Sequence, residues 1–181
     1  MSSKKILPLL FLYFTTVSCV DDLDFDQIND YSVTPEFTTA LTFFKILTFQ
    51  FFNSAGIQES ERTDITDLRI FDNSYVKDKL IKLDFNIDIK NEFDKVFIIQ
   101  IEFLNQNNSL TYRFKEIIIS ANDLDFNFLE EIDVNSNQNV KNTSKVRINV
   151  KLANPLLPID PNDTTELELK SSLKLYFDTD A

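Results

Sequence analysis

Strict alternation of apolar and polar residues constrains this chain more than any other feature of its sequence. The clearest run covers residues 83–89, and the same pattern recurs in residues 97–103, 146–152 and 167–177. Successive side chains of a β-strand point to opposite faces, so each run predicts a strand with one buried and one solvated face.

Three other segments are less regular. Residues 37–52 are dense in Thr, Phe and Ile and favour a strand buried on both faces, with a helix as the alternative. Residues 53–66 predict a long loop, and residues 68–71 a short strand. Residues 122–133 suit a strand, of which residues 129–132 could instead form a single helical turn.

The connections between these segments indicate how the strands follow one another. Turns at residues 91–92 and 105–109 predict two successive hairpins, and therefore a meander of at least three antiparallel strands. The third strand begins at Leu110 and continues as a buried piece at residues 117–119. Residues 154–165 hold three prolines and predict a connection, because proline cannot donate to a strand ladder.

Seven or eight strands without a convincing helix pattern predict an all-β fold, an antiparallel β-sandwich over residues 36–181. An immunoglobulin-like and a jelly-roll-like arrangement satisfy the strand count equally well. The cysteine–tryptophan–cysteine signature of true immunoglobulin domains is absent from the sequence. Since Gly56 is the only glycine, asparagine and aspartate are expected at most turn positions with positive φ.

The N-terminal segment, residues 1–18, predicts a secretory signal peptide. Lys4 and Lys5 precede an apolar run at residues 6–17, and a small residue closes it. That run is shorter than the roughly 20 apolar residues of a membrane-spanning helix. Cys19 follows at once and is the only cysteine, so it cannot form an intramolecular disulfide.

The sequence Val17-Ser18-Cys19 resembles a bacterial lipobox, although Thr16 stands where that motif usually has leucine. The resemblance implies that the Cys19 thiol is diacylated and that Cys19 becomes the mature N-terminus. One acyl chain gives only marginal membrane binding, so the two or three chains of a lipoprotein are needed for a stable anchor. The alternative is a general signal peptide with an incidental cysteine near its end.

Residues 19–35 predict an acidic tether. Its residues Asp21, Asp22 and Asp24 resemble the surface-export signal of Bacteroidota lipoproteins, and residues 19–30 are similar to flavobacterial lipoproteins of unknown function. The resemblance implies a lipid-anchored protein of the outer membrane, with its folded domain facing the cell exterior.

Composition excludes several classes of function. The chain has no histidine, which removes histidine-based triads and histidine zinc sites. A single glycine rules out a glycine-rich phosphate loop, and a lipidated Cys19 would leave no thiol nucleophile. The formal net charge is −11, and removal of the signal peptide with its two lysines makes it more negative. Such a chain is not expected to bind nucleic acid or anionic headgroups.

Carboxylates are the remaining catalytic groups. A glycan hydrolase would need two of them about 5–9.5 Å apart. Asp84 and Asp88 would lie on one face about 13 Å apart, from a rise of about 3.3 Å per residue, and are expected to form a solvated row. Glu130 and Glu131 would point to opposite faces of a strand. We therefore expect no enzymatic activity.

Oxygen-rich loops suggest a calcium site as the more plausible chemistry. The candidate ligands are Asp160, Asn162 and Asp163 in the proline-flanked loop, with Asp123 and Asp125 as a second possibility. Neither loop follows the EF-hand spacing, and turn formation explains the same residues. No other cofactor is indicated.

The function predicted from the sequence is that of a non-enzymatic surface lipoprotein with a binding, adhesion or structural role. Its partners would be the membrane, through the anchor, and a protein or glycan ligand. Asp163-Thr164-Thr165 also resembles a Bacteroidota O-glycosylation motif, which implies Thr164 as an acceptor. The alternatives are a periplasm-facing accessory subunit of an outer-membrane complex and a carboxylate-dependent glycan hydrolase.

Overall fold

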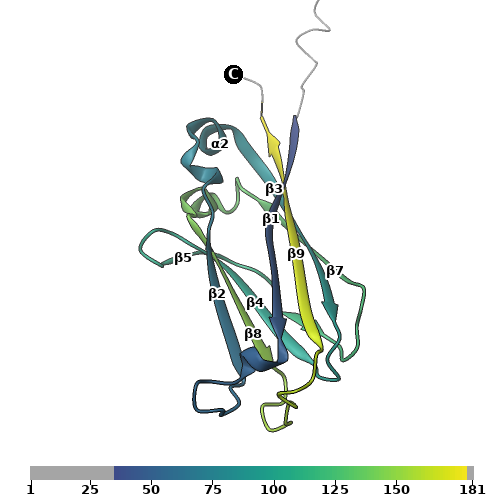
Figure 1. The fold of residues 1–181 in the computed structure, drawn as a ribbon. Coiled ribbons are helices and arrows are strands. Elements are labelled where there is room, and N and C mark those ends of the chain that lie inside the picture. The colour runs from purple at the N-terminus through teal and green to yellow at the C-terminus, as the bar shows by residue number, and fades with distance from the viewer. Residues whose placement is uncertain (1–34, 179–181) are drawn as a thin grey trace, which may run out of the picture. The chain divides into compact units, whose positions relative to one another are not determined.

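The computed structural model describes residues 35–178, which form two antiparallel sheets packed face to face (Figure 1). The predicted all-β sandwich is confirmed. The strands are β1 (Glu36–Leu47), β2 (Glu61–Asp67), β3 (Leu80–Asn91), β4 (Phe97–Leu104), β5 (Leu110–Arg113), β6 (Ile117–Ile119), β7 (Phe126–Asp133), β8 (Lys145–Leu152) and β9 (Glu166–Phe177). The helical elements are η3 (Thr48–Phe51), η4 (Ile70–Asp72), α2 (Ser74–Lys79) and η5 (Gln138–Asn142).

The predicted signal peptide and most of the predicted tether lie outside the described residues. The same is true of Cys19, Asp21, Asp22 and Asp24, so the lipidation and export assignments stay predictions.

The strand order identifies the sandwich as a jelly roll. One sheet has the order β1-β9-β3-β7, and the other has β2-β8-β4-β5 with β6 also paired to β4. The pairs β1 with β9, β2 with β8, β3 with β7 and β4 with β5 are nested, as if one long hairpin were rolled into two sheets. This is jelly-roll topology, so the strand order decides between the two arrangements that the sequence left open.

The first predicted hairpin is wrong, because β3 and β4 belong to different sheets. The segment between them crosses from one sheet to the other, and the buried Asn91 side chain stabilises it. The Asn91 amide nitrogen donates to the carbonyls of Lys95 at 2.9 Å and Ser120 at 2.7 Å, while its oxygen accepts from the Phe93 amide at 3.0 Å. The second predicted hairpin, β4 with β5, is confirmed.

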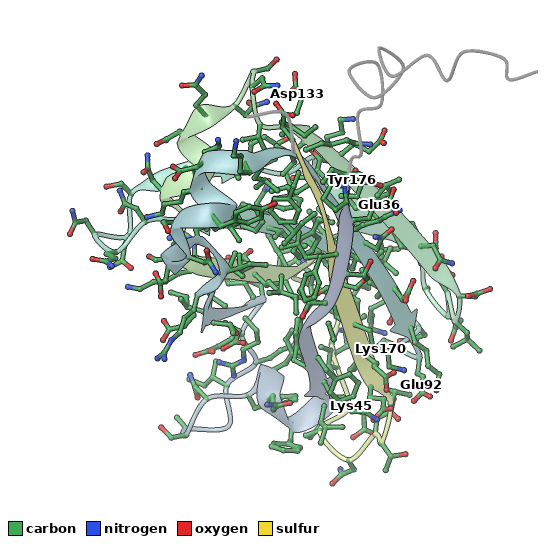
Figure 2. The ribbon with its side chains drawn as sticks, turned by 90° about the horizontal axis from the view of Figure 1, so that it is seen from above. Glu36, Lys45, Glu92, Asp133, Lys170 and Tyr176 are labelled. Carbon is green, nitrogen blue, oxygen red and sulfur yellow. The ribbon has the colours of Figure 1, made fainter. Side chains whose placement is uncertain are left out.

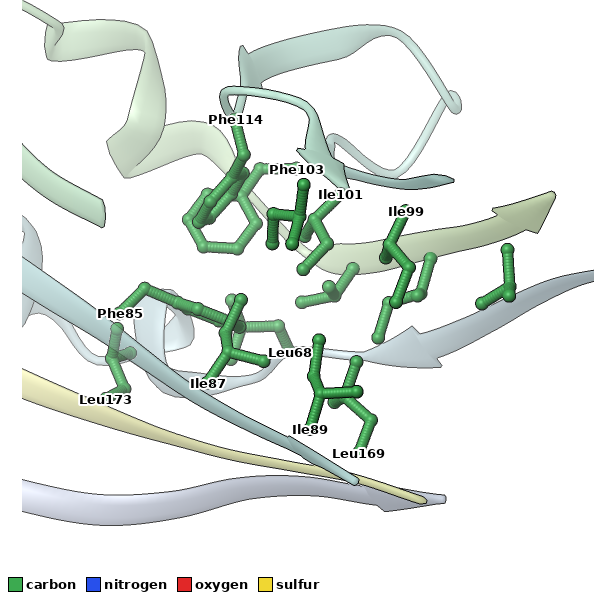
Figure 3. Packing of buried hydrophobic residues seen from close by; sticks show 14 of the residues in the cluster. Leu68, Phe85, Ile87, Ile89, Ile99, Ile101, Phe103, Phe114, Leu169 and Leu173 are labelled. Carbon is green, nitrogen blue, oxygen red and sulfur yellow. The ribbon is translucent and has the colours of Figure 1, made fainter. Parts of the chain in front are cut away.

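The core lies between the two sheets and consists mainly of the apolar residues of the alternating runs (Figure 3). Phe85 on β3 packs edge to face against Phe103 and Phe114 across the interface, with ring centroids 5.8 and 4.9 Å apart. Phe103 and Phe114 are themselves 4.9 Å apart. Burying each such ring contributes roughly 1.5–3 kcal/mol, which makes this cluster a main source of stability.

The predictions fail mainly near the N-terminal end of the domain. Residues 37–52 form β1 and the 3₁₀ turn η3, but β1 is an edge strand and Phe43 is 58% exposed, so burial on both faces is wrong. The predicted loop 53–66 contains most of β2, a strand rich in charged residues. Residues 68–71 are not a strand, because Leu68 and Phe71 both turn into the core at a helical spacing of three.

Three smaller predictions are also settled. Residues 126–133 form one continuous strand, so the helical turn at 129–132 is wrong. The piece at residues 117–119 is buried at Ile117 and Ile119, as predicted, but Ile118 between them is exposed. Asn108 and Asn122 adopt positive φ of 60° and 55°, alongside Gly56 at 75°. Asparagine therefore does take the turn positions that glycine usually occupies.

Candidate functional site

Figure 1 shows the end of the sandwich where β1 begins, β9 ends and α2 lies. An apolar groove lies beside β1 at this end. We call it the β1 groove. Its volume is about 560 Å³. It is lined by Pro35, Glu36, Phe37, Arg69, Ile70, Asn73, Tyr75, Val76, Leu175 and Phe177. Rings and aliphatic side chains thus make most of its wall, as is usual for binding sites in proteins.

Local interactions hold the walls of the groove in place. Asn73 begins α2 as its N-cap, with its side-chain oxygen accepting from the Tyr75 amide at 2.9 Å. The Tyr75 ring then packs 5.5 Å from the ring of Phe177 at the end of β9. On the opposite wall, Phe37 pairs with the buried Leu175 and faces inward, yet it is 57% exposed. The inner face of β1 is therefore uncovered at this end.

A second hollow of about 310 Å³ lies further along β1 and differs in character. Phe44 and Ile46 of β1 form one wall, while Arg62 and Asp64 of β2 form part of the other. These two charged residues point inward because the register pairs β2 with the buried residues of β8. Arg62 binds the Glu59 carboxylate at 2.6 Å and the Phe52 carbonyl at 3.2 Å, but its buried Nε has no partner within residues 35–178.

The outer edge of β1 differs from the other strand edges of the sandwich. No strand among residues 35–178 pairs with it, and the eight residues from Phe37 to Phe44 carry no charge, glycine or proline. By contrast, β2 has four charged residues out of seven, β7 has three acids, and β5 is only four residues long. Charges and short length protect edge strands from pairing with another chain, whereas β1 is long and uncharged from Phe37 to Phe44.

Charged residues mark the two ends of β1 on the outer face of the sheet (Figure 2). Glu36 binds Lys174 at 2.6 Å, and Lys45 binds Glu166 at 2.7 Å and Glu168 at 3.1 Å. Hydrogen bonds to Glu166 and Glu168 raise the pKa of Lys45, so its ammonium group is charged throughout the physiological range.

The carboxylates of β3 correct the expectation of a solvated row. Asp88 is exposed, but Asp84 is buried beneath Tyr176, whose hydroxyl donates to it at 2.7 Å. Lys82 lies between Asp84, at 3.0 Å, and Glu131, at 2.6 Å, on the adjacent strand. Hydrogen bonds to Glu131 and Asp84 raise the pKa of Lys82. The Lys82 ammonium group therefore joins β3 to β7 on the outer face of the sheet.

Glu130 is a buried acid. The sequence predicted that it points away from Glu131, but not that its carboxylate is buried. Glu130 and Glu131 do face opposite ways: Glu130 is 4% exposed on the inner face, and Glu131 is exposed. The Tyr112 hydroxyl donates to Glu130 at 2.8 Å, while the second carboxylate oxygen has no partner within residues 35–178. Burial and this hydrogen bond raise the pKa of Tyr112 to about 12, so the phenol stays protonated and can donate. The alternation from Phe126 to Ile132 does place Glu130 on the inner face.

A buried carboxylate on β4, Glu102, was missed entirely. It lies between Arg113 of β5 and Arg147 of β8, whose Nε atoms donate to it at 2.9 and 2.8 Å. Burial alone would raise the pKa of Glu102, but hydrogen bonds and charge from the two arginines outweigh it and lower the pKa. Only the strand register brings these three residues together, so no local sequence signal could have found them.

The predicted calcium ligands act as turn residues. Asp160 accepts from the Asn162 amide at 2.9 Å, and Asp163 accepts from the Thr165 amide at 3.1 Å, which are hydrogen bonds of Asx turns. Thr164 is exposed between them. The calcium and glycosylation assignments stay predictions.

The alternative ligands occupy a similar turn, in which Asp123 accepts weakly from the Asp125 amide at 3.4 Å. No group of three His, Cys, Asp or Glu side chains suited to a metal ion occurs in the described part of the chain. Within the same residues, no helix is long and apolar enough to cross a membrane.

Comparison with known proteins finds similarity in fold alone. No family model matches the chain, and no curated protein matches it by sequence. A protein of Parabacteroides distasonis provisionally described as secreted is 12% identical, with a TM-score of 0.47 over 64% of this chain and 38% of its own. VP2 of infectious bursal disease virus is 9% identical, with a TM-score of 0.40 over 80% of this chain and 33% of its own.

A third similar structure, that of Desmodium yellow mottle tymovirus, is 14% identical, with a TM-score of 0.37 over 80% of this chain and 82% of its own. The chain thus spans about a third of the length of the first two structures. Similarity at this level carries no argument about what the chain binds or does.

Proposed function

We propose that this protein is a lipid-anchored, non-enzymatic binding protein of the bacterial cell surface, and that it holds a partner polypeptide along β1. The observation that carries the binding role is the combination of the β1 groove with an uncharged, unpaired strand edge. Addition of a strand to such an edge supplies main-chain hydrogen bonds, and adjacent pockets for alternate side chains supply specificity.

Two features of the edge favour an extended polypeptide over a compact ligand. The available strand is 12 residues long, far longer than a small molecule requires. The groove lies on the inner side of this same strand, where every second side chain of an added strand would point. Phe37, inward-facing and 57% exposed, is then the residue that a bound strand would cover.

Cross-linking in intact cells tests the binding role. A photoreactive amino acid replaces Phe37 in the full-length chain, and a matched variant carries it at Leu129, a 50% exposed residue on the opposite edge strand. We expect a discrete cross-linked species from position 37 and none from position 129. Equal yields from the two positions would count against a binding edge at β1.

The anchor is tested separately. Metabolic labelling with a fatty-acid analogue should label the wild-type chain, and Cys19→Ser should abolish labelling and block removal of the signal peptide. Undiminished labelling of the Cys19→Ser chain would refute the assignment. External protease should trim the protein on intact cells, whereas complete protection would favour the periplasm-facing alternative.

A further inference from the structure

We propose that the strand added to β1 is β1 of a second copy of this chain, paired antiparallel about a two-fold axis near Ala40. The inference rests on the proposed binding role of this edge and names the partner. A two-fold axis makes the contact self-complementary and closed. If one residue of the first copy contacts another residue of the second copy, the same two positions also meet with the copies exchanged.

The irregularity in β1 allows self-pairing in a register that spans the shift. The ladder with β9 shifts between Ala40 and Thr42, so the outward residues are Glu36, Thr38 and Ala40 before the shift, and Phe43 and Lys45 after it. Opposed residues of an antiparallel pair lie on the same face. A register that places Glu36 opposite Lys45 of the second copy also places Thr38 opposite Phe43, and the shift keeps all of these side chains on the outer face.

Charge complementarity selects this register. It brings a carboxylate and an ammonium group together at both ends of the paired strands, and Figure 2 shows Glu36 and Lys45 near opposite ends of β1. Between them the strand is uncharged, so no like charges oppose the pairing. The acids on β2 and β7 disfavour equivalent self-pairing of those edges, because like charges directly opposite one another destabilise a strand pair.

The inward-facing side chains of β1 fit the same register. Phe37 and Phe44 both point inward, and Phe44 of the second copy would lie opposite Phe37. Phe37 lines the β1 groove and Phe44 lines the second hollow, so the pairing would set the groove of each copy beside the hollow of the other. Dimerisation would thereby remove from water the aromatic surface that the monomer leaves exposed.

Two differently tagged full-length copies, expressed together, provide the test. With the photoreactive residue at position 37, the cross-linked species should carry both tags. Ala40→Lys places two ammonium groups beside the axis and should lower the yield about tenfold. Ile65→Lys, at an exposed position on the edge strand β2, makes the same charge change and should leave the yield unchanged. Equal thermal unfolding of the two variants establishes that both are folded.

Charge reversal tests the register. Glu36→Lys and Lys45→Glu should each reduce the two-tag product, and the double variant should restore it. Both residues also have intramolecular partners, which the double variant does not restore, so recovery reports on the contact between copies. If the double variant gave as little two-tag product as the single variants, the proposed register would be wrong.

The same cross-link separates this inference from the proposed function. A product that joins the chain to a different polypeptide would overturn pairing with a second copy while supporting a binding edge. Yields at position 37 no greater than at position 129 would overturn both.

Discussion

The two sides of the jelly roll are closed to different extents. On the side formed by β5 and β7, the Tyr112 hydroxyl reaches across the gap between the sheets to Glu130, at 2.8 Å. Nearby, the hydroxyls of Thr111 and Thr143 share a buried hydrogen bond at 2.7 Å. On the side formed by β1 and β2, the inner face of β1 carries two hollows, and Phe37 is mostly exposed.

This difference shows what closes the side of a sandwich. Apolar alternation fills the middle of the interface, but on the closed side of this sandwich a long side chain also reaches the opposite sheet and finds a polar partner. Tyr112 does this with Glu130. The inward-facing residues of β2 that line the second hollow, Arg62 and Asp64, are charged, and burying unpaired charge is unfavourable. The open side is therefore the one on which we propose that a partner binds.

The largest expected effect is in the aromatic core next to the closed side. Phe103→Ala should lower the free energy of unfolding by about 3–5 kcal/mol, because a fully buried ring is lost and a cavity remains. Urea denaturation of the purified protein measures this. Phe43→Ala, at a 58% exposed position on β1, is the matched control and should change the free energy of the unpaired chain by less than about 0.5 kcal/mol. Similar losses for both would contradict the contrast between the two sides.

Removal of the closing hydrogen bond should have an intermediate effect. Tyr112→Phe leaves the buried Glu130 carboxylate without its donor, which costs about 1–3 kcal/mol of unfolding free energy. A double-mutant cycle with Glu130→Leu, which has no acceptor for the Tyr112 hydroxyl, isolates the interaction. Strictly additive effects of the two substitutions would mean that the hydrogen bond does not stabilise the closed side.

Alkaline pH should weaken the closed side selectively. The folded chain raises the pKa of Tyr112 to about 12, above the value of 10 expected on unfolding, so the folded state keeps the phenol proton longer. The resulting stabilisation is complete below about pH 10 and is lost as pH rises through about 12. Denaturation from pH 9 to pH 12, roughly that window, should show stability falling more steeply for wild type than for Tyr112→Phe. The raised pKa of Tyr176 is common to both chains and serves as an internal reference.

The smallest effect on stability is expected at the open side. In the unpaired chain, at concentrations low enough to dissociate the proposed dimer, Phe37→Ala should change the free energy of unfolding by less than about 0.5 kcal/mol, because the ring is then mostly in water. A loss of more than about 2 kcal/mol would mean that the ring is covered in the isolated chain, as a buried residue would be.

How much of the structure can be predicted from the sequence depends on how far apart in the chain the interacting residues lie. Whether a residue faces the core depends on its own polarity and on the strand period, both local properties. That is why Val146, Ile148, Val150 and Leu152 are all buried as the alternation predicts. The turn asparagines at positive φ are predictable for the same reason.

Strand partners depend on the whole chain. The alternation that identified β3 and β4 is the same whether they pair with each other or lie in different sheets, and only the packing of all the strands separated them. β2 has no apolar row of its own and is a strand because β8 pairs with it along its full length. Its charges, which predicted a loop, are those of an edge strand.

The candidate site shows the same division between what the local sequence predicts and what the packing of the whole chain decides. The sequence by itself determined that residues 37–44 are uncharged and rich in strand-forming residues, and that the chain has no histidine. Only the tertiary structure placed β1 at an edge, opened a groove beside it, and brought Tyr112 to Glu130 and two arginines to Glu102. The reason is that a hydrogen-bonded ladder or a cross-sheet contact joins residues distant in sequence, and no local pattern records which distant segment becomes the neighbour.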